Sequence, residues 1–191
     1  MIDSRFDKLE QKLISPDFRT SKGKANEVNY HIFDYNAKDE LIIRDRIDDL
    51  LQKYKKGTYD FELKVFDLYD IIMEMLENKN FIDKCKNLEK SQGLDKITTG
   101  LNQMLRMSED NSNNLILKHI KDNIDSNSIV IIKGVGKVFP FVRSHKILNN
   151  LHQCIDTVPV IMFYPGKFDE GYLSLFGEIK DDNYYRAFGF E

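Results

Sequence analysis

Two apolar runs in the last third of the chain constrain its fold more than any other feature. The first, 129–132, reads Ile-Val-Ile-Ile, and the second, 158–164, reads Val-Pro-Val-Ile-Met-Phe-Tyr. Strands that are covered on both faces lack polar alternation, so each run predicts a strand of a sheet buried by helices. Between the runs, apolar residues recur at the spacing of a helix, at Ile147, Leu148, Leu151 and Ile155. Strand, helix and strand in this order are typical of a parallel crossover.

Each run ends in a turn that contains glycine. Pro140 is expected in the first turn of the joining helix, because its missing N–H has no partner there in any case. Open α/β sheets place their functional residues at the carboxyl ends of the strands. The candidate functional residues in these strand-end loops are Gly134, Gly136, Lys137, Arg143, His145, Pro165 and Gly166.

The rest of the chain alternates strand-like and helix-like periods. This alternation predicts parallel strands near 30–35, 60–66, 129–133 and 159–163. Asp67 suits the N-cap of the helix that follows the second strand, because its carboxylate accepts a hydrogen bond from a free backbone N–H.

The chain should close on an antiparallel hairpin after residue 172. Segments 173–177 and 184–190 have strand-like composition, and the intervening 180–183, Lys-Asp-Asp-Asn, has turn composition. In the middle, 79–125 has helical spacing throughout and predicts a helical layer or insertion.

These patterns predict one α/β domain over 1–191. Its mixed, largely parallel central sheet is flanked by helices and carries the helical insertion and the C-terminal antiparallel hairpin.

Composition narrows the class of protein. Apolar residues make up 41% of the chain and charged residues 31%, which is usual for a folded soluble protein. The net charge of −3 gives no electrostatic reason to expect nucleic-acid binding. Cys85 and Cys154 both fall in helical patterns, so we expect buried free thiols and a cytoplasmic protein. The charged N-terminus and the shortness of the apolar runs argue against a signal peptide and a membrane span.

The Gly-Val-Gly-Lys motif at 134–137 invites a phosphate-binding interpretation, but its spacing fails. A Walker loop needs four residues between its glycines and then Lys followed by Ser or Thr. Here the glycines are one residue apart and Val138 follows the lysine. The dinucleotide fingerprint also fails, because Phe139 stands where its third glycine belongs. We therefore expect no cofactor, no metal and no catalytic set from the motifs.

The segment Tyr184-Tyr185-Arg186 has two interpretations. Aromatic strands are usually core, and period-two alternation would place Tyr184 and Arg186 on one face and Tyr185 on the other. Tyrosine and arginine are also enriched in protein interfaces. The three residues are therefore candidate interface residues as well as candidate core.

Three long segments resemble one known family. They are Ile-Lys-Gly-Val-Gly-Lys-Val-Phe-Pro-Phe-Val-Arg-Ser-His at 132–145, Val-Pro-Val-Ile-Met-Phe-Tyr-Pro-Gly at 158–166, and Asp-Asp-Asn-Tyr-Tyr-Arg-Ala-Phe at 181–188. Together with Tyr-His-Ile-Phe-Asp-Tyr at 30–35, they are similar to the BrxB family of bacterial BREX phage-defence systems. The resemblance covers essentially the whole chain and is strongest over 129–190.

The resemblance implies a cytoplasmic component of phage defence without established catalytic activity or catalytic residues. It implies an adaptor or regulator whose leading partner is PglZ, a protein of the alkaline-phosphatase superfamily, with other BREX components as further candidate partners. An alternative from the residues alone is a small-molecule or nucleotide binder, a degenerate NTPase-like domain that uses Gly134, Gly136, Lys137 and Arg143. The failed Walker spacing favours the adaptor.

Overall fold

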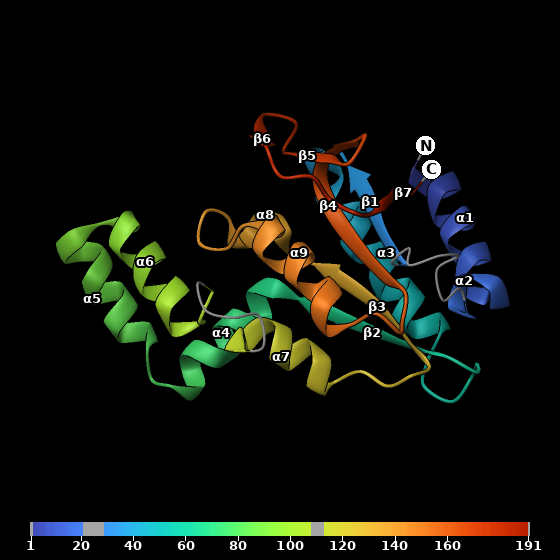
Figure 1. The fold of residues 1–191 in the computed structure, drawn as a ribbon, viewed down its shortest axis with the longest axis horizontal. Coiled ribbons are helices and arrows are strands. Elements are labelled where there is room, and N and C mark those ends of the chain that lie inside the picture. The colour runs from blue at the N-terminus through green and yellow to red at the C-terminus, as the bar shows by residue number, and fades with distance from the viewer. Residues whose placement is uncertain (1, 21–28, 108–112, 191) are drawn as a thin grey trace.

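The computed structural model describes residues 2–20, 29–107 and 113–190, without the side chains of Thr20, His145, Asn149, His152 and Gln153. A seven-stranded sheet lies between helices on its two faces (Figure 1). The helices are α1 (Ile2–Ile14), α2 (Pro16–Thr20), the 3-10 helix η1 (Ala37–Asp39), α3 (Glu40–Lys53), α4 (Leu68–Asn78), α5 (Ile82–Gln92), α6 (Leu94–Met104), α7 (Leu115–Asp122), α8 (Val135–Val138) and α9 (Ser144–Cys154). The strands are β1 (Tyr30–Tyr35), β2 (Glu62–Asp67), β3 (Ser128–Lys133), β4 (Val160–Asp169), β5 (Tyr172–Leu175), β6 (Ile179–Asp181) and β7 (Phe188–Gly189).

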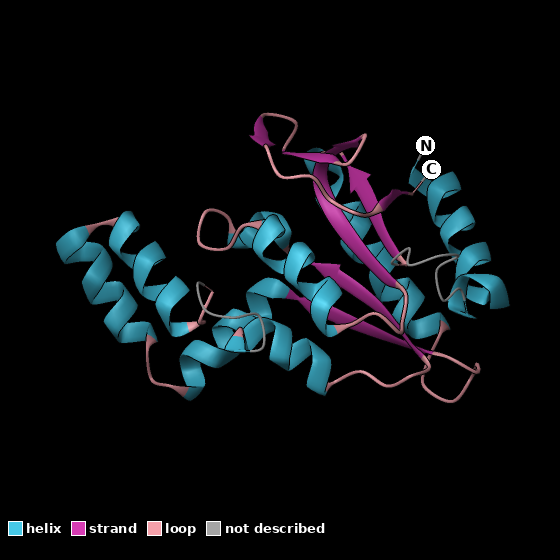
Figure 2. Cartoon of the chain, viewed as in Figure 1, coloured by secondary structure: helices cyan, strands magenta, loops and turns pink. Residues whose placement is uncertain are grey.

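The main path of the sheet runs β2-β3-β4-β1-β7, and every pairing along it is parallel. β4 continues beyond this path and pairs antiparallel with β5, which pairs antiparallel with β6. The predicted α/β class, the four parallel strands and the crossover from β3 through a helix to β4 are confirmed (Figure 2).

Side chains of alternate residues in the central strands pack into two separate hydrophobic cores, one on each face of the sheet. Val130 and Ile132 of β3 face the core formed with α4 and α6 to α9, whereas Ile129 and Ile131 face the core formed with α1 and α3. All four side chains are at most 1% exposed, which explains why this run has no polar alternation.

The C-terminal hairpin forms from other residues than those predicted. β5 turns back into β6 through Phe176–Glu178, and Lys180 and Asp181, expected in the turn, lie in β6. Residues 184–187 lie outside the strands, and β7 pairs parallel with β1 instead of antiparallel with β5. The physical reason is local: Phe176 and Gly177 adopt positive φ, so the turn begins at 176 instead of 180, four residues earlier than expected.

The joining helix also begins later than predicted. Pro140 lies in the loop between α8 and α9, and the long helix starts at Ser144. The first helical turn after β3 is instead the short helix α8, whose N-cap is Gly134.

The predicted helical insertion consists of α5, α6 and α7. Figure 1 shows α5 and α6 side by side and extending away from the sheet. None of the residues of α5 is fully buried, although Cys85 and Leu88 pack against the core from partly buried positions. Cys85 and Cys154 are both free thiols, as expected, but each is only partly buried.

His31 of β1 is a partly buried titratable residue among aromatic rings. Its ring lies 5.1 Å from the ring of Phe18 and 5.8 Å from that of Phe188, measured between centroids. Nε2 is 2.8 Å from Asn29 Oδ1, and buried Nδ1 has no hydrogen-bond partner among the described residues. Burial, assisted by the charge of Lys12, lowers the pKa of His31 to about 4.

This environment predicts a pH-dependent stability. The folded-state pKa lies below the unfolded value of 6.5, so the unfolded chain binds the extra proton first. The contribution of His31 is therefore complete above pH 6.5 and is lost as the pH falls toward 4, by roughly 2–3 kcal/mol. Denaturant unfolding at pH 7 and pH 4.5 should show a smaller loss in His31→Phe than in wild type. Equal losses in the two proteins would contradict the prediction.

Candidate functional site at the carboxyl ends of the strands

Asp67, the last residue of β2, is the centre of the charged cluster at this edge. It is 7% exposed and, as predicted, caps α4 by accepting a hydrogen bond from the backbone N–H of Tyr69 at 3.0 Å. Its Oδ2 lies 2.5 Å from Lys137 Nζ and 3.9 Å from Lys133 Nζ. Two ammonium groups and an N–H therefore compensate one buried carboxylate, which joins β2 to the loop after β3.

Gly134 fits this junction because it has no side chain. Its φ is +83°, and a Cβ built there would collide with Asp67 Oδ1. The premise that a glycine-only turn follows the first apolar run is confirmed.

Gly136 and Gly166 are required for a different reason, close approach. A Cβ on Gly136 would lie 3.0 Å from the ring of Phe176 and 3.1 Å from Pro165 Cγ. A Cβ on Gly166 would collide with the carbonyl oxygen of Ser174 on β5. The predicted turn at Pro165 and Gly166 is wrong: both residues lie inside β4, which continues to Asp169 and pairs with β5 from Gly166 onward. The missing side chains of Gly136 and Gly166 let β4 and the β5–β6 turn pack against α8.

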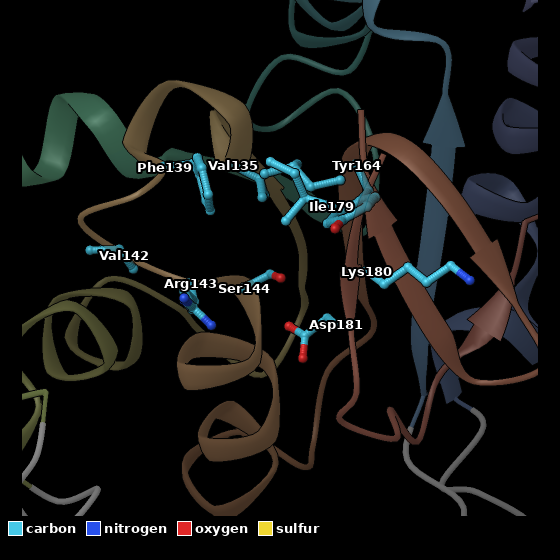
Figure 3. Close-up of a pocket in the computed structure, with 10 residues that line it drawn as sticks. Val135, Phe139, Val142, Arg143, Ser144, Tyr164, Ile179, Lys180 and Asp181 are labelled. Carbon is cyan, nitrogen blue, oxygen red and sulfur yellow. The ribbon is translucent and has the colours of Figure 1, made fainter. Parts of the chain in front are cut away.

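A small pocket opens beside this junction (Figure 3). Val135, Phe139 and Tyr164 line its apolar side, and Arg143, Ser144 and Asp181 contribute its polar atoms. Lys180 also lines it, but its ammonium group points away from Arg143 in Figure 3. The cavity volume is about 30 Å³, which holds a water molecule or two and not a nucleotide.

Two of the polar residues of this pocket, Asp181 and Ser144, contact Tyr185. Tyr185 donates its phenolic hydrogen to Asp181 Oδ2 at 2.6 Å, and its oxygen lies 3.5 Å from Ser144 Oγ. Burial raises the pKa of both Tyr164 and Tyr185 above the usual range, so both phenols stay protonated at neutral pH. Two protonated phenols are not general bases, and the hydrogen bond from Tyr185 to Asp181 is a structural contact.

A second, more open crevice of about 250 Å³ lies where β1 ends and its pairing with β4 stops. Arg5 of α1 reaches into it, with Nη2 2.9 Å from Asp34 Oδ1 and 2.8 Å from the carbonyl oxygen of Phe190. The remaining oxygen of Asp34 accepts the backbone N–H of Phe168 at 3.3 Å. Arg5 therefore ties the first helix to β1 and to the end of the chain.

The structure brings most of the predicted strand-end residues together. Gly134, Gly136, Lys137, Pro165 and Gly166 meet around the junction of α8 and β4. Arg143 is exposed, at the pocket in Figure 3. The side chain of His145 lies outside the described part of the structure.

The predicted interface segment divides by burial. Tyr184 is 60% exposed and Arg186 is also exposed, whereas Tyr185 is 1% exposed and belongs to the core. The ring of Tyr184 packs edge-on against that of Tyr172 at 5.8 Å.

Sequence reasoning did not identify Asp67 as the partner of Lys137, nor the Arg5–Asp34 pair. Asp67 carried only its capping signal, and the two lysines lie about 70 residues away in sequence. No local pattern reports such a pairing. Within residues 2–20, 29–107 and 113–190, no helix is long and apolar enough to span a bilayer, and no group of three His, Cys, Asp or Glu side chains could hold a metal ion.

These features define an α/β protein with a mostly parallel sheet whose charged strand-end residues are paired with one another. The family model described as "BREX protein BrxB" matches residues 64–190. A "BREX protein BrxB" of Bacillus cereus (strain H3081.97) is 43% identical over 187 residues, covering 98% of this chain and 96% of the relative. One of Escherichia coli O9:H4 (strain HS) is 27% identical over 190 residues, covering 98% and 90%. The chain belongs to the BrxB family. No solved structure matches it.

The junction at Gly134 predicts a specific loss of stability. Gly134→Val forces a β-branched residue into positive φ and drives its Cβ into Asp67, so it should destabilise by about 3 kcal/mol or more. Gly57→Val is the matched control, because Gly57 has φ +84° but nothing within 4 Å of a built Cβ. It should carry only the backbone penalty of roughly 1–2 kcal/mol. Denaturant unfolding measures both, and equal losses would remove the role assigned to the Asp67 contact.

Proposed function

We propose that this protein is a non-catalytic component of a BREX phage-defence system, acting in the cytoplasm as an adaptor. Its leading partner is the PglZ-type protein of the alkaline-phosphatase superfamily. Membership of the BrxB family supports the system, and the resemblance described above supplies the partner.

One observation carries the non-catalytic part of the proposal: the candidate residues at the strand ends have structural partners. Lys137, the residue that a phosphate site would use, binds the buried carboxylate of Asp67. Asp181, a possible general base, accepts a hydrogen bond from Tyr185. The pocket beside them has room for water only. This arrangement also disfavours the alternative of a nucleotide-binding domain.

Large apolar side chains on the surface support a binding role. Leu41 is 70% exposed, and the exposed residues Tyr184 and Arg186 keep their place as candidate anchors. Tyr185 anchors the segment in the core instead.

The adaptor proposal predicts that affinity-tagged chain, co-expressed with the neighbouring defence genes, retains the PglZ-type protein. Deletion of the gene should abolish protection in plaque counts, and the wild-type gene should restore it. A chain variant that no longer retains the partner but protects fully would contradict the adaptor role.

The paired lysine gives a second prediction, about chemistry. Lys137→Ala should cost about 1–2 kcal/mol of unfolding free energy, because it removes one of the cations that compensate buried Asp67. Highly purified wild type and variant should both lack ATP hydrolysis. Steady ATP turnover by the wild type that disappears in Lys137→Ala would contradict the structural role.

A further inference from the structure

The free edge of β2 is the longest strand edge without a strand partner on the main path of the sheet. β2 pairs with β3 on one side, and no other described strand pairs with its opposite side. An open strand edge presents unpaired backbone N–H and C=O groups and can accept an added strand.

The direction of these backbone groups follows from the register. Glu62 donates its N–H to the carbonyl oxygen of Asn127, toward β3. Because successive residues of a strand point their hydrogen-bonding groups to opposite sides, those of Lys64 also face β3. The groups of Leu63 and Val65 then face the open edge.

A groove of about 470 Å³ runs along this edge. Leu51 of α3 and Val65 line its apolar side. On the other side lie α4 and α7, which contribute Asp70, Glu74 and His119. The groove therefore has a strand edge as its floor, an apolar wall and a polar wall.

The lysines of the groove have ion-pair partners, whereas two of its carboxylates have none among the described residues. Its two lysines are already paired: Lys64 Nζ lies 3.0 Å from Glu62 Oε1, and Lys133 Nζ lies 3.9 Å from Asp67 Oδ2. Asp70 and Glu74 are exposed, stand one helical turn apart, and form no ion pair with a described residue. The polar wall therefore offers two carboxylates to a cationic partner.

A second copy of this chain is a poor occupant. A symmetric dimer through this edge requires antiparallel pairing of β2 with itself, which keeps α4 of both copies on the same face of the joined sheet. The β2 strand of the second copy contains one cation, Lys64, and its Nζ already lies 3.0 Å from Glu62 Oε1. A second copy would therefore leave Asp70 and Glu74 without a cationic partner.

We infer that the open edge of β2 is the docking site for an extended segment of the partner protein, which adds to the sheet as a strand. The segment carries Lys or Arg toward α4 and apolar side chains toward Leu51 and Val65, at alternate positions. This inference rests on the proposed function, because it names the surface through which the adaptor binds the PglZ-type protein.

The first test reverses the carboxylates of the polar wall. The double variant Asp70→Lys/Glu74→Lys should retain the co-expressed PglZ-type protein at least about tenfold less than wild type, because like charges would then meet. The matched control is Glu89→Lys/Asp95→Lys, which reverses the same two residue types on α5 and α6, away from the groove. It should retain the partner at the wild-type level.

The second test removes an outward-facing donor. Val65→Pro deletes an N–H that faces the open edge and leaves the β2–β3 hydrogen bonds in place, and proline is tolerated on edge strands. Binding should fall by about tenfold or more. Thermal unfolding of every variant checks that the fold is kept. If Val65→Pro does not fold, the charge pair and its control decide the question.

The outcomes separate the two levels of the argument. No retention of the PglZ-type protein by the wild type would overturn the adaptor proposal itself. Retention by the wild type and undiminished retention by the folded Asp70/Glu74 double variant would overturn only the β2 site. The β2 site would also be overturned if Tyr184→Ala/Arg186→Glu lost the partner while the Asp70/Glu74 double variant and Val65→Pro retained it fully. A wild-type dimer that Val65→Pro converts to a monomer would assign the edge to a second copy and contradict the inference.

Discussion

The burial of β3 and β4 on both faces is the constraint on which the rest of the structure depends. Each strand carries apolar side chains above and below the sheet, and each fully buried aliphatic residue contributes about 1.5–3 kcal/mol relative to exposure. Neither layer of helices can be omitted, because either face would then expose a continuous apolar surface. The side chains of α1 and α3 cover one face and those of α4, α6, α7, α8 and α9 cover the other.

Because helices cover both faces of the sheet, its polar groups lie at the strand ends and along the strand edges. At the carboxyl ends, Asp67, Lys133 and Lys137 satisfy one another, and Gly134 lets the backbone pass beside the carboxylate. At the side, β2 keeps one row of backbone groups without a strand partner among the described residues. The edge thus retains the hydrogen-bonding capacity that the strand ends have used.

The sequence predicts the central strands well and the periphery less well, for one physical reason. The strand at Ile129–Ile132 is recognisable in the sequence because both of its faces are buried. A strand buried on both faces consists of consecutive apolar residues. The last hairpin depends instead on backbone conformation at Phe176 and Gly177 and at Glu170 and Gly171, where positive φ sets the turns. Composition favoured the polar 180–183 as the turn, but the positive-φ turn at 176–178 determined the register.

Some residues of the candidate site could likewise be predicted from the sequence and others could not. The glycine at 134 could be placed at a strand end from sequence because its position follows a buried run. Its partner Asp67 could not, because the contact joins the end of one strand to the loop after another. Tyr185 is buried between exposed Tyr184 and Arg186, which is the alternation that period two predicts, although these residues lie outside the strands.

The pairing of β1 with strands from the far end of the chain has a consequence for synthesis. Tyr30 lies beside Val160, and His31 lies beside Phe188. At translation rates of about 5–20 residues per second, β1 leaves the ribosome roughly ten seconds before either neighbour exists. During that interval its apolar face and both of its edges must be kept from other nascent chains. The helices α4 to α7, whose contacts are closer in sequence, can form meanwhile, so the first strand made is among the last to find its place in the sheet.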